Sequence, residues 1–404
     1  MKVLFVIGDD FPDTGACTSL LKNLLLTGVY EQNDIQVEVL AVKSKFSESQ
    51  TDSFGDITVH NLTLMSKVSK NEYVNFFKYH PFKTVIGLLK KFITVNQSRN
   101  IKSINVSEVE KKIKQLSDVN FDAVFAVMGD FEIAKAIAII KNKQPELKTV
   151  LYQVDPCSTN DVLTKKGCIN EYIKLENELY YSYDKIVTTP IIIDEARNKY
   201  PEEVLNKMVP MEFPNVVPNV KKPEEYKDKI RCVFTGSIYA DFRDPTYTLR
   251  LFNALDQNVN LEIFGKVKTE YLKSFEEYGA YYHGEKSLEE TKQELILSDF
   301  LVNIGNKMTN QVPSKIFEYI SYGKPIVNVC KNRECPTIPY LKKYPLALNL
   351  YEEDEIFDEQ VQLLKQFISA SYNERIPESD ILIRFKKCTP DYCAELLCDI
   401  LNDL

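Results

Sequence analysis

Long apolar runs, histidine and export features are scarce in this 404-residue sequence. No run of about 18 apolar residues occurs, which excludes a membrane-spanning helix. The start MKVLFVIGDD places one Lys before a short apolar run that ends in two aspartates. We therefore expect a first β-strand there rather than a signal peptide. The three histidines are far apart and form no metal-ligand pattern with cysteines or carboxylates, so we expect no bound structural metal.

Cysteine is present in an odd number, nine, without an export signal, which predicts reduced thiols in a cytoplasmic protein. Cys388, Cys393 and Cys398 recur every five residues. On a helix this spacing turns successive side chains about 140° apart. These thiols therefore cannot converge on one metal ion.

The length of the chain predicts two domains. Its apolar content of 44% and charged content of 27% are typical of soluble globular proteins. Buried strands alternate with amphipathic helices on both sides of a proline-rich, non-periodic stretch, which predicts two Rossmann-like α/β domains. We expect a first domain over 1–208, a linker over 209–229 and a second domain over 230–386.

The stretch from Lys67 to Lys102 is basic and rich in aromatic residues, with eight Lys or Arg and one Glu in a chain of net charge −8. This composition favours reversible docking on an anionic membrane surface. A nucleic acid is the rival partner, but the acidic chain and the lack of a binding motif count against it. The alternative is a solvated helix with a buried aromatic face.

The most informative stretch runs from Val312 to Cys330, VPSKIFEYISYGKPIVNVC. Pro313 and Ser314 are typical of a helix start, with the Ser hydroxyl as its cap. Gly323 is typical of a helix end, and the apolar run after Pro325 predicts a buried parallel strand. The alternative interpretation is an ordinary amphipathic helix of an α/β domain.

The start of this predicted helix and two of its charged side chains could bind a nucleotide. The start of a helix presents free N–H groups and a positive end, to which Lys315 would add a cation for a diphosphate. Glu318, one turn further on, can accept hydrogen bonds from both hydroxyls of a ribose.

A second loop follows the predicted strand 230–235. Gly236 and Ser237 could bring backbone N–H groups near a phosphate, and Arg243 is a bidentate partner for it. The alternative is a surface Arg in a turn that contains proline.

The segment PSKIFEYISYGKPIV resembles the nucleotide-sugar signature of family 4 glycosyltransferases of the GT-B fold. The resemblance implies that Glu318 holds the donor ribose and that Gly236 and Arg243 contact the donor diphosphate. Many members of that family have a second Glu, which contacts the donor sugar, where this sequence has Asn310. It also implies two domains facing a central cleft, with the C-terminal helix, 387–404, packed on the first domain.

The resemblance further implies transfer with retention of anomeric configuration and no divalent metal. Arg243, Lys315 and Lys266 would then neutralise the leaving diphosphate. No cofactor is expected, because the nucleoside-diphosphate sugar is a co-substrate.

The remaining candidates line the same predicted cleft. Gly15 would let a substrate approach the backbone, or it serves a tight turn. Asp155 follows a strand and would face the acceptor, or it caps its loop. His283 would form part of the wall around the base, with a turn or core histidine as the alternative. Asn306 could bind sugar hydroxyls, as could Asn303.

We therefore predict a glycosyltransferase whose acceptor is a glycan or a lipid-linked sugar of cell-envelope, capsular or exopolysaccharide synthesis. We expect it in the cytoplasm, in part peripheral at the inner face of the cell membrane. Two alternatives remain: a catalytically silent glycosyltransferase-like partner subunit and a GT-B nucleotide-sugar 2-epimerase.

Overall fold

The structure is a computed structural model of the 404-residue chain. It describes residues 1–13, 15–44, 51–64, 104–116, 121–128, 131–155, 169–222, 229–239, 242–308, 311–353 and 356–404. The predicted membrane-docking stretch, 67–102, and Asn310 lie outside the described residues.

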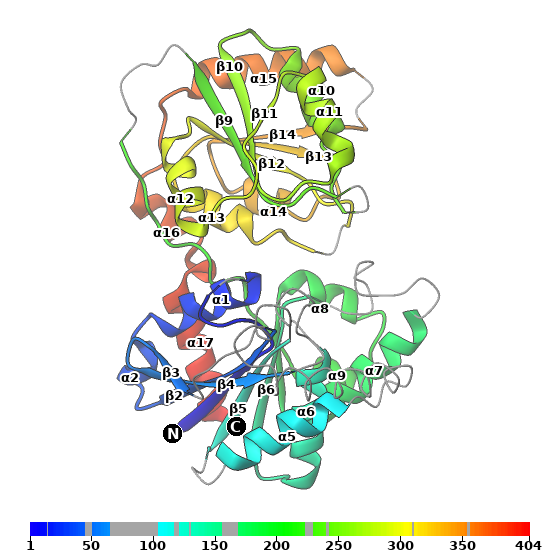
Figure 1. The fold of residues 1–404 in the computed structure, drawn as a ribbon, viewed down its shortest axis with the longest axis vertical. Helices are drawn as coiled ribbons and strands as arrows, with labels where there is room; N and C mark the ends of the chain where they lie inside the picture. Colours follow the sequence, from blue (N-terminus) through cyan, green and yellow to red (C-terminus); the bar gives the residue numbers. More distant parts are fainter. Residues whose placement is uncertain are drawn as a thin grey trace, which may run out of the picture. The chain divides into compact units, whose positions relative to one another are not determined.

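The chain forms two compact units, each an α/β sheet with its own helices (Figure 1). The first unit comprises residues 1–214 and 390–404, and the second comprises residues 215–389. Both sheets consist almost entirely of parallel strands, which confirms the predicted Rossmann-like class.

The first sheet has the strand order β3-β4-β2-β1-β5-β6-β7-β8, and only β3 runs antiparallel to its neighbour. Its central strands are apolar on both faces, because helices cover both sides of a parallel sheet. The strands are β1 Lys2–Ile7, β2 Gln36–Lys43, β3 Thr51–Phe54, β4 Ile57–Thr63, β5 Ala123–Met128, β6 Lys148–Gln153, β7 Lys185–Thr188 and β8 Met208–Pro210.

The helices of the first unit bury apolar faces against this sheet; α6, for example, buries its Ile and Ala residues. The C-terminal helix α17 packs on α1 and α2, as predicted for the end of the chain. The helices are α1 Ala16–Leu25, α2 Val29–Gln32, α5 Ile104–Leu116, α6 Phe131–Lys143, α7 Ile169–Ser182, α8 Pro190–Ala196, α9 Glu202–Leu205 and α17 Pro390–Asp403.

The second sheet is fully parallel, in the order β11-β10-β9-β12-β13-β14. Chain order reverses between β9 and β12, and ligands of open α/β sheets bind beyond the carboxyl ends of the strands at such a switch point. The strands are β9 Ile230–Thr235, β10 Val259–Phe264, β11 Tyr281–Tyr282, β12 Phe300–Ile304, β13 Ile326–Cys330 and β14 Ala347–Tyr351.

One helix of the second unit begins at a clear capping signal. Ser287 and Glu290 form a complete capping box at the start of α12. The helices are α10 Thr246–Asn253, α11 Leu272–Glu277, α12 Leu288–Leu297, α13 Lys315–Ser321, α14 Ile338–Leu341, α15 Phe357–Ser371 and α16 Glu378–Arg384, with 3₁₀ turns η1 Thr269–Tyr271 and η2 Lys386–Cys388.

The exit from α13 is fixed by two residues of the predicted Gly-Lys-Pro turn. Gly323 has φ +65°, and a Cβ there would lie 2.5 Å from the carbonyl oxygen of Ile376. Lys324 is 1% exposed, and its Nζ donates to the carbonyls of Leu295 at 2.8 Å and Ile296 at 2.5 Å. The buried ammonium thus caps the carboxyl end of α12.

The proline-rich stretch predicted as a linker, 209–229, is ordered over its first part. Residues 209 and 210 pair with β7 as part of β8, and Phe213 is buried in the first unit. Val216 is buried in the second unit, where its N–H donates to the carbonyl of Cys388. The units divide between Pro214 and Asn215, and residues 223–228 lie outside the description.

Candidate functional site

The switch point of the second sheet carries a compact polar cluster. Gly236 and Ser237 directly follow β9, and Asn306 comes two residues after β12. Arg243 joins the two strand ends: its Nη1 donates to the carbonyl of Ser237 at 3.1 Å, and its Nη2 donates to Asn306 Oδ1 at 2.6 Å. Four of the predicted site residues therefore form one cluster where a parallel sheet binds ligands.

Glycine is required in this loop because the chain passes close to its neighbours. Gly236 has φ +152°, and a Cβ there would lie 3.1 Å from Arg243 Nη1. Gly265, after β10, has φ +128°, and a Cβ there would lie only 2.1 Å from the carbonyl oxygen of Gly236. Two glycines thus let the loops after β9 and β10 touch backbone to backbone.

Arg243 is a buried cation with no carboxylate partner among the described residues. Its side chain is 7% exposed and lies over the rings of Phe234 and Phe242, each 5.5 Å from the guanidinium carbon. In the described part of the chain, no carboxylate forms an ion pair with it, and its Nε lacks a hydrogen-bond partner. Burial lowers the pKa of Arg243 to about 10. An anion at this point would relieve the desolvation of the charge.

The helix α13 is tied to the same strand end. Tyr319 Oη accepts a hydrogen bond from the N–H of Thr235 at 2.9 Å, at the last residue of β9. On this helix Lys315 Nζ contacts Glu318 Oε2 at 2.7 Å, and both side chains are partly exposed. The two residues predicted to serve diphosphate and ribose are therefore neighbours, and each neutralises the other.

The predicted cap of α13 is corrected in one respect. Ser314 is the N-cap residue, but its backbone is helical (φ −57°, ψ −24°), and its hydroxyl makes no cap hydrogen bond. A hydroxyl caps a helix from an extended backbone, which this position lacks. Pro313 is buried, and its carbonyl accepts from the N–H of Ile316 at 3.1 Å.

Lys266 and His283 lie at the side of the cluster, near the end of β10. Lys266 is exposed, and its carbonyl accepts from the N–H of Ile238 at 2.9 Å. The His283 ring stacks on Phe264, with centroids 4.5 Å apart, and its Nε2 lies 3.3 Å from Glu262 Oε2. The histidine is thus packed on β10, and a role next to a base stays a prediction.

Sequence reasoning missed the role of Tyr319, and it gave Asn303 a role that the structure does not support. Asn303 is 2% exposed, and its Nδ2 donates to Asn328 Oδ1 at 2.7 Å. Asn328 in turn donates to Asn349 Oδ1 at 2.7 Å, so one amide from each of β12, β13 and β14 forms a ladder. Only the register of the three strands shows this pairing.

The carboxyl edge of the first sheet is acidic. Thr18 Oγ1 donates to Asp9 Oδ2 at 3.0 Å, and a Cβ on Gly15, at φ +147°, would lie 1.7 Å from that oxygen. Burial, followed by the carboxylates of Asp155 and Asp9, raises the pKa of Cys17 to about 12. Gly15 therefore accommodates the Asp9 carboxylate, a residue that the sequence analysis did not single out.

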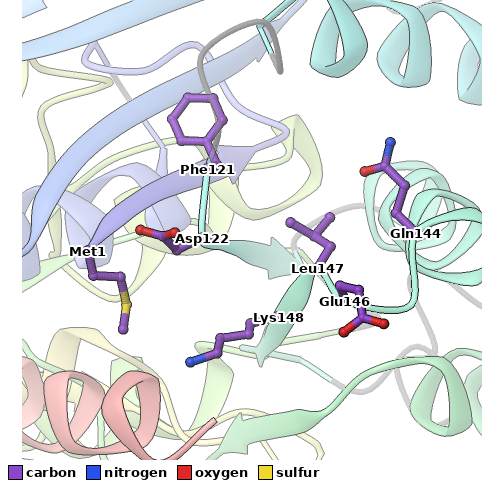
Figure 2. A pocket seen from close by; sticks show the side chains of 7 residues that line it. All are labelled: Met1, Phe121, Asp122, Gln144, Glu146, Leu147 and Lys148. Atoms are coloured by element: carbon purple, nitrogen blue, oxygen red, sulfur yellow. The ribbon is translucent and has the colours of Figure 1, made fainter.

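Two cavities of the first unit lie away from this edge. One, of about 540 Å³, lies at the amino ends of β1, β5 and β6 and is lined by Met1, Phe121, Asp122, Gln144, Glu146, Leu147 and Lys148 (Figure 2). The other, of about 1050 Å³, opens beside the amino ends of β1 and β2. Parallel sheets bind substrates at the opposite edge, so we assign neither cavity a role.

The described residues contain neither a cluster of metal ligands nor a helix that could cross a membrane. No three His, Cys, Asp or Glu side chains gather there as ligands of a metal ion would. None of the helices within the described ranges has the length and apolar content needed to cross a membrane.

The sequence matches no known protein family and no curated protein, whereas the fold matches solved glycosyltransferases along its whole length. One is the lipopolysaccharide outer core galactosyltransferase WaaB in its apo form (13% identity, TM-score 0.61, all of both chains). Another is Alr3699/HepE of Anabaena in complex with UDP and glucose (10%, 0.63, all of both chains). A third is the E. coli trehalose-6-phosphate protein bound with UDP-2-fluoro glucose (11%, 0.62, 100% and 99%). The chain therefore has the two-domain GT-B fold.

Proposed function

We propose that this protein is a metal-independent, retaining glycosyltransferase similar to those of family 4, which moves a sugar from a nucleoside-diphosphate sugar to an acceptor hydroxyl. The observation that carries the proposal is Arg243, a buried guanidinium without a carboxylate partner in the described chain, at the switch point of the second sheet. A diphosphate supplies the anion that this position lacks. The solved structures of the same fold support the donor class, because two of them hold UDP or a UDP-sugar.

Each residue of the cluster has a role in this proposal. The diphosphate lies against Arg243 and the backbone N–H of Ser237, because the N–H of Gly236 donates to the carbonyl of Phe264 at 2.9 Å. Gly236 contributes the close approach of the backbone rather than a donor. Lys315 and the exposed Lys266 add positive charge nearby. Because Lys315 contacts Glu318 in the absence of ligand, a diphosphate would draw the ammonium away and leave the carboxylate for the ribose hydroxyls.

Further residues would complete the donor site. We assign Asn306, which holds the guanidinium at 2.6 Å, and Asn310 to the side of the donor sugar. His283 would line the base beside β10. Ser314 and Lys315 would present their backbone N–H groups to the diphosphate, and Pro313 leads the chain into this start of α13. The chemistry then consists of stabilising the charge that develops on the leaving diphosphate, which fixed cations do without a metal ion.

The acceptor would be bound by the first unit. Asp155 and the loop that contains Gly15 follow strands of its sheet, and the neighbouring Asp9 carboxylate can accept a hydrogen bond from a sugar hydroxyl. We propose a glycan or lipid-linked acceptor of envelope, capsular or exopolysaccharide synthesis, reached at an anionic membrane surface through 67–102 on the cytoplasmic side.

A thermal-shift panel of UDP-, GDP-, ADP- and CMP-sugars tests the proposal, because a ligand that binds the native state raises the melting temperature. We expect one nucleotide class, UDP first, to raise it. Glu318→Ala removes the ribose contact and should abolish the shift. The matched control Glu359→Ala changes an exposed residue of α15 and should keep the shift.

If no nucleotide sugar raises the melting temperature, the proposed donor site is wrong. If Glu318→Ala binds donor as well as the wild type does, the ribose assignment is wrong. Product analysis separates the remaining alternatives. Donor binding without turnover would indicate a silent partner subunit, and free nucleotide without an acceptor-dependent product would indicate an epimerase.

A further inference from the structure

Two buried thiols share one hydroxyl beneath the Arg243 cluster. Cys330 ends β13 and is 2% exposed, and Cys335 lies five residues later and is 6% exposed. Their Sγ atoms lie 3.8 Å and 3.1 Å from Thr337 Oγ1. Asn328 fixes the arrangement, because its Nδ2 donates to Cys330 Sγ at 3.2 Å and its Oδ1 accepts from Thr337 Oγ1 at 3.2 Å.

The two thiols differ in acidity. A hydrogen bond from Cys330 is the main cause that lowers the pKa of Cys335 to about 7; burial opposes it, and Thr337 and the Arg243 charge contribute. The same hydrogen bond and burial hold the pKa of Cys330 far above its ordinary value. The hydrogen bond and the Arg243 charge therefore favour the thiolate form at Cys335 over that at Cys330. A nucleophilic sulfur thus lies beside a sulfur that can resolve it.

The pair also contacts the strand end that holds Arg243. The N–H of Gly305 donates to the carbonyl of Val329 at 2.8 Å. A Cβ on Gly305 would lie 3.2 Å from Cys330 Cα and 3.3 Å from its Sγ, so glycine is needed for this approach. The next residue, Asn306, accepts the 2.6 Å hydrogen bond from Arg243. A movement of Cys330 is therefore transmitted to Asn306 through a single residue.

We propose that Cys330 and Cys335 are an oxidation site that peroxide converts to a disulfide, and that the disulfide weakens diphosphate binding by displacing Asn306 from Arg243. The Cys335 thiolate attacks one peroxide oxygen, the O–O bond breaks, and a sulfenic acid and one water form after protonation. The Cys330 thiol then attacks the Cys335 sulfur and expels a second water. Two thiols are oxidised, and one peroxide is reduced to two waters.

Formation of the disulfide does not depend on the proposed function, whereas the effect of the disulfide on diphosphate binding rests on it. The test treats the full-length protein with hydrogen peroxide, blocks remaining thiols with iodoacetamide and maps tryptic peptides by mass spectrometry. Lys331 and Arg333 lie between the two cysteines, so trypsin leaves two peptides joined only by the disulfide. UDP affinity is measured by calorimetry before oxidation, after oxidation and after reduction with dithiothreitol.

We expect the joined peptides in the oxidised wild type, with about tenfold weaker UDP binding that dithiothreitol restores. Cys335→Ser should keep its affinity for UDP through the peroxide treatment. The matched control Cys388→Ser removes another buried thiol of the second unit and should respond as the wild type does.

The proposed disulfide is refuted if Cys330 and Cys335 are recovered in unjoined peptides from oxidised wild-type protein. This result does not depend on the folding of any variant. The link to binding is refuted if the disulfide forms while UDP affinity is unchanged. If the reduced protein binds neither UDP nor any other nucleotide of the thermal-shift panel, the proposed function fails, and peptide mapping still decides whether the pair is oxidised.

Discussion

The carboxyl edges of the two sheets have opposite electrostatic character, and the pKa of one cysteine at each edge shows the difference. In the first unit, burial and then the carboxylates of Asp155 and Asp9 raise the pKa of Cys17 to about 12. In the second unit, the hydrogen bond from Cys330 lowers the pKa of Cys335 to about 7, with a contribution from Arg243. Two sheets of the same parallel class therefore present a proton-accepting edge and an anion-accepting edge.

Under the proposed function, the two sheets would bind the two substrates of one transfer reaction. Carboxylates accept hydrogen bonds from hydroxyl groups, which suits a sugar acceptor. A buried guanidinium favours a phosphate, which suits a nucleotide donor. Both sheets are built from the same kind of strand, so the loops after the strands decide whether an edge favours a hydroxyl or a phosphate.

The largest expected effect comes from Gly15→Ala, which tests whether the acidic edge is as tightly built as its geometry indicates. A Cβ would lie 1.7 Å from Asp9 Oδ2 at φ +147°. We expect the first unit to lose about 3 kcal/mol of unfolding free energy, from strain and displacement of the carboxylate. Hydrogen exchange of the β1 amides measures it.

Gly28→Ala is the matched control for that substitution. Gly28 also has a positive φ, +70°, but no atom lies within 4 Å of its added Cβ. We expect a loss of about 1 kcal/mol from backbone strain alone. Equal losses in the two variants would contradict the tight contact between Gly15 and Asp9.

The next effect tests the basic edge. Arg243→Gln removes a buried guanidinium and should weaken UDP binding about 100-fold, or about 2.7 kcal/mol, in calorimetry. The unliganded melting temperature should not fall, because the lost charge is desolvated and has no ionic partner among the described residues. A lower melting temperature with unchanged affinity would make Arg243 a structural residue.

Arg250→Gln is the control for Arg243. Arg250 is an exposed residue of α10 whose guanidinium lies 4.9 Å from the centroid of the Phe357 ring. Its loss removes a charge of the same sign from the same unit without touching the cluster. We expect UDP affinity within a factor of about two of the wild type.

The smallest effect compares the two thiols directly. Near pH 7.5, iodoacetamide should alkylate Cys335 about tenfold faster than Cys17, because the thiolate is the reactive form. The rate of alkylation at Cys335 should rise with pH through about 7 and then level off, because above its lowered pKa the thiol is already largely ionised. Quantitative peptide mass spectrometry measures both rates. Faster alkylation of Cys17 would remove the electrostatic contrast between the edges.

Local sequence signals predicted the elements around the candidate site well. The stretch from Val312 to Cys330 was predicted as a helix followed by a buried strand, and α13 and β13 confirm it. Gly323 ends the helix in the left-handed conformation that its place in the sequence indicates. These features depend on neighbours a few residues apart, so propensity and capping chemistry decide them.

The contacts within the site were beyond such signals. Arg243 and Asn306 are 63 residues apart in the chain, and Thr235 and Tyr319 are 84 apart. Neither pair has a sequence spacing that indicates contact. The strand order of the second sheet, which places β12 beside β9, brings both pairs together.

The sequence by itself determined the α/β class, the positions of most strands and the kinds of side chain that follow them, because hydrophobic periodicity and turn chemistry are local. The tertiary structure alone decided that Arg243 is buried with no carboxylate beside it in the described ranges, that Lys315 contacts Glu318, and that Cys330 and Cys335 share Thr337. Burial and charge pairing depend on which distant segments pack together. Desolvation, which gives these groups their chemistry, exists only once the sheets are assembled.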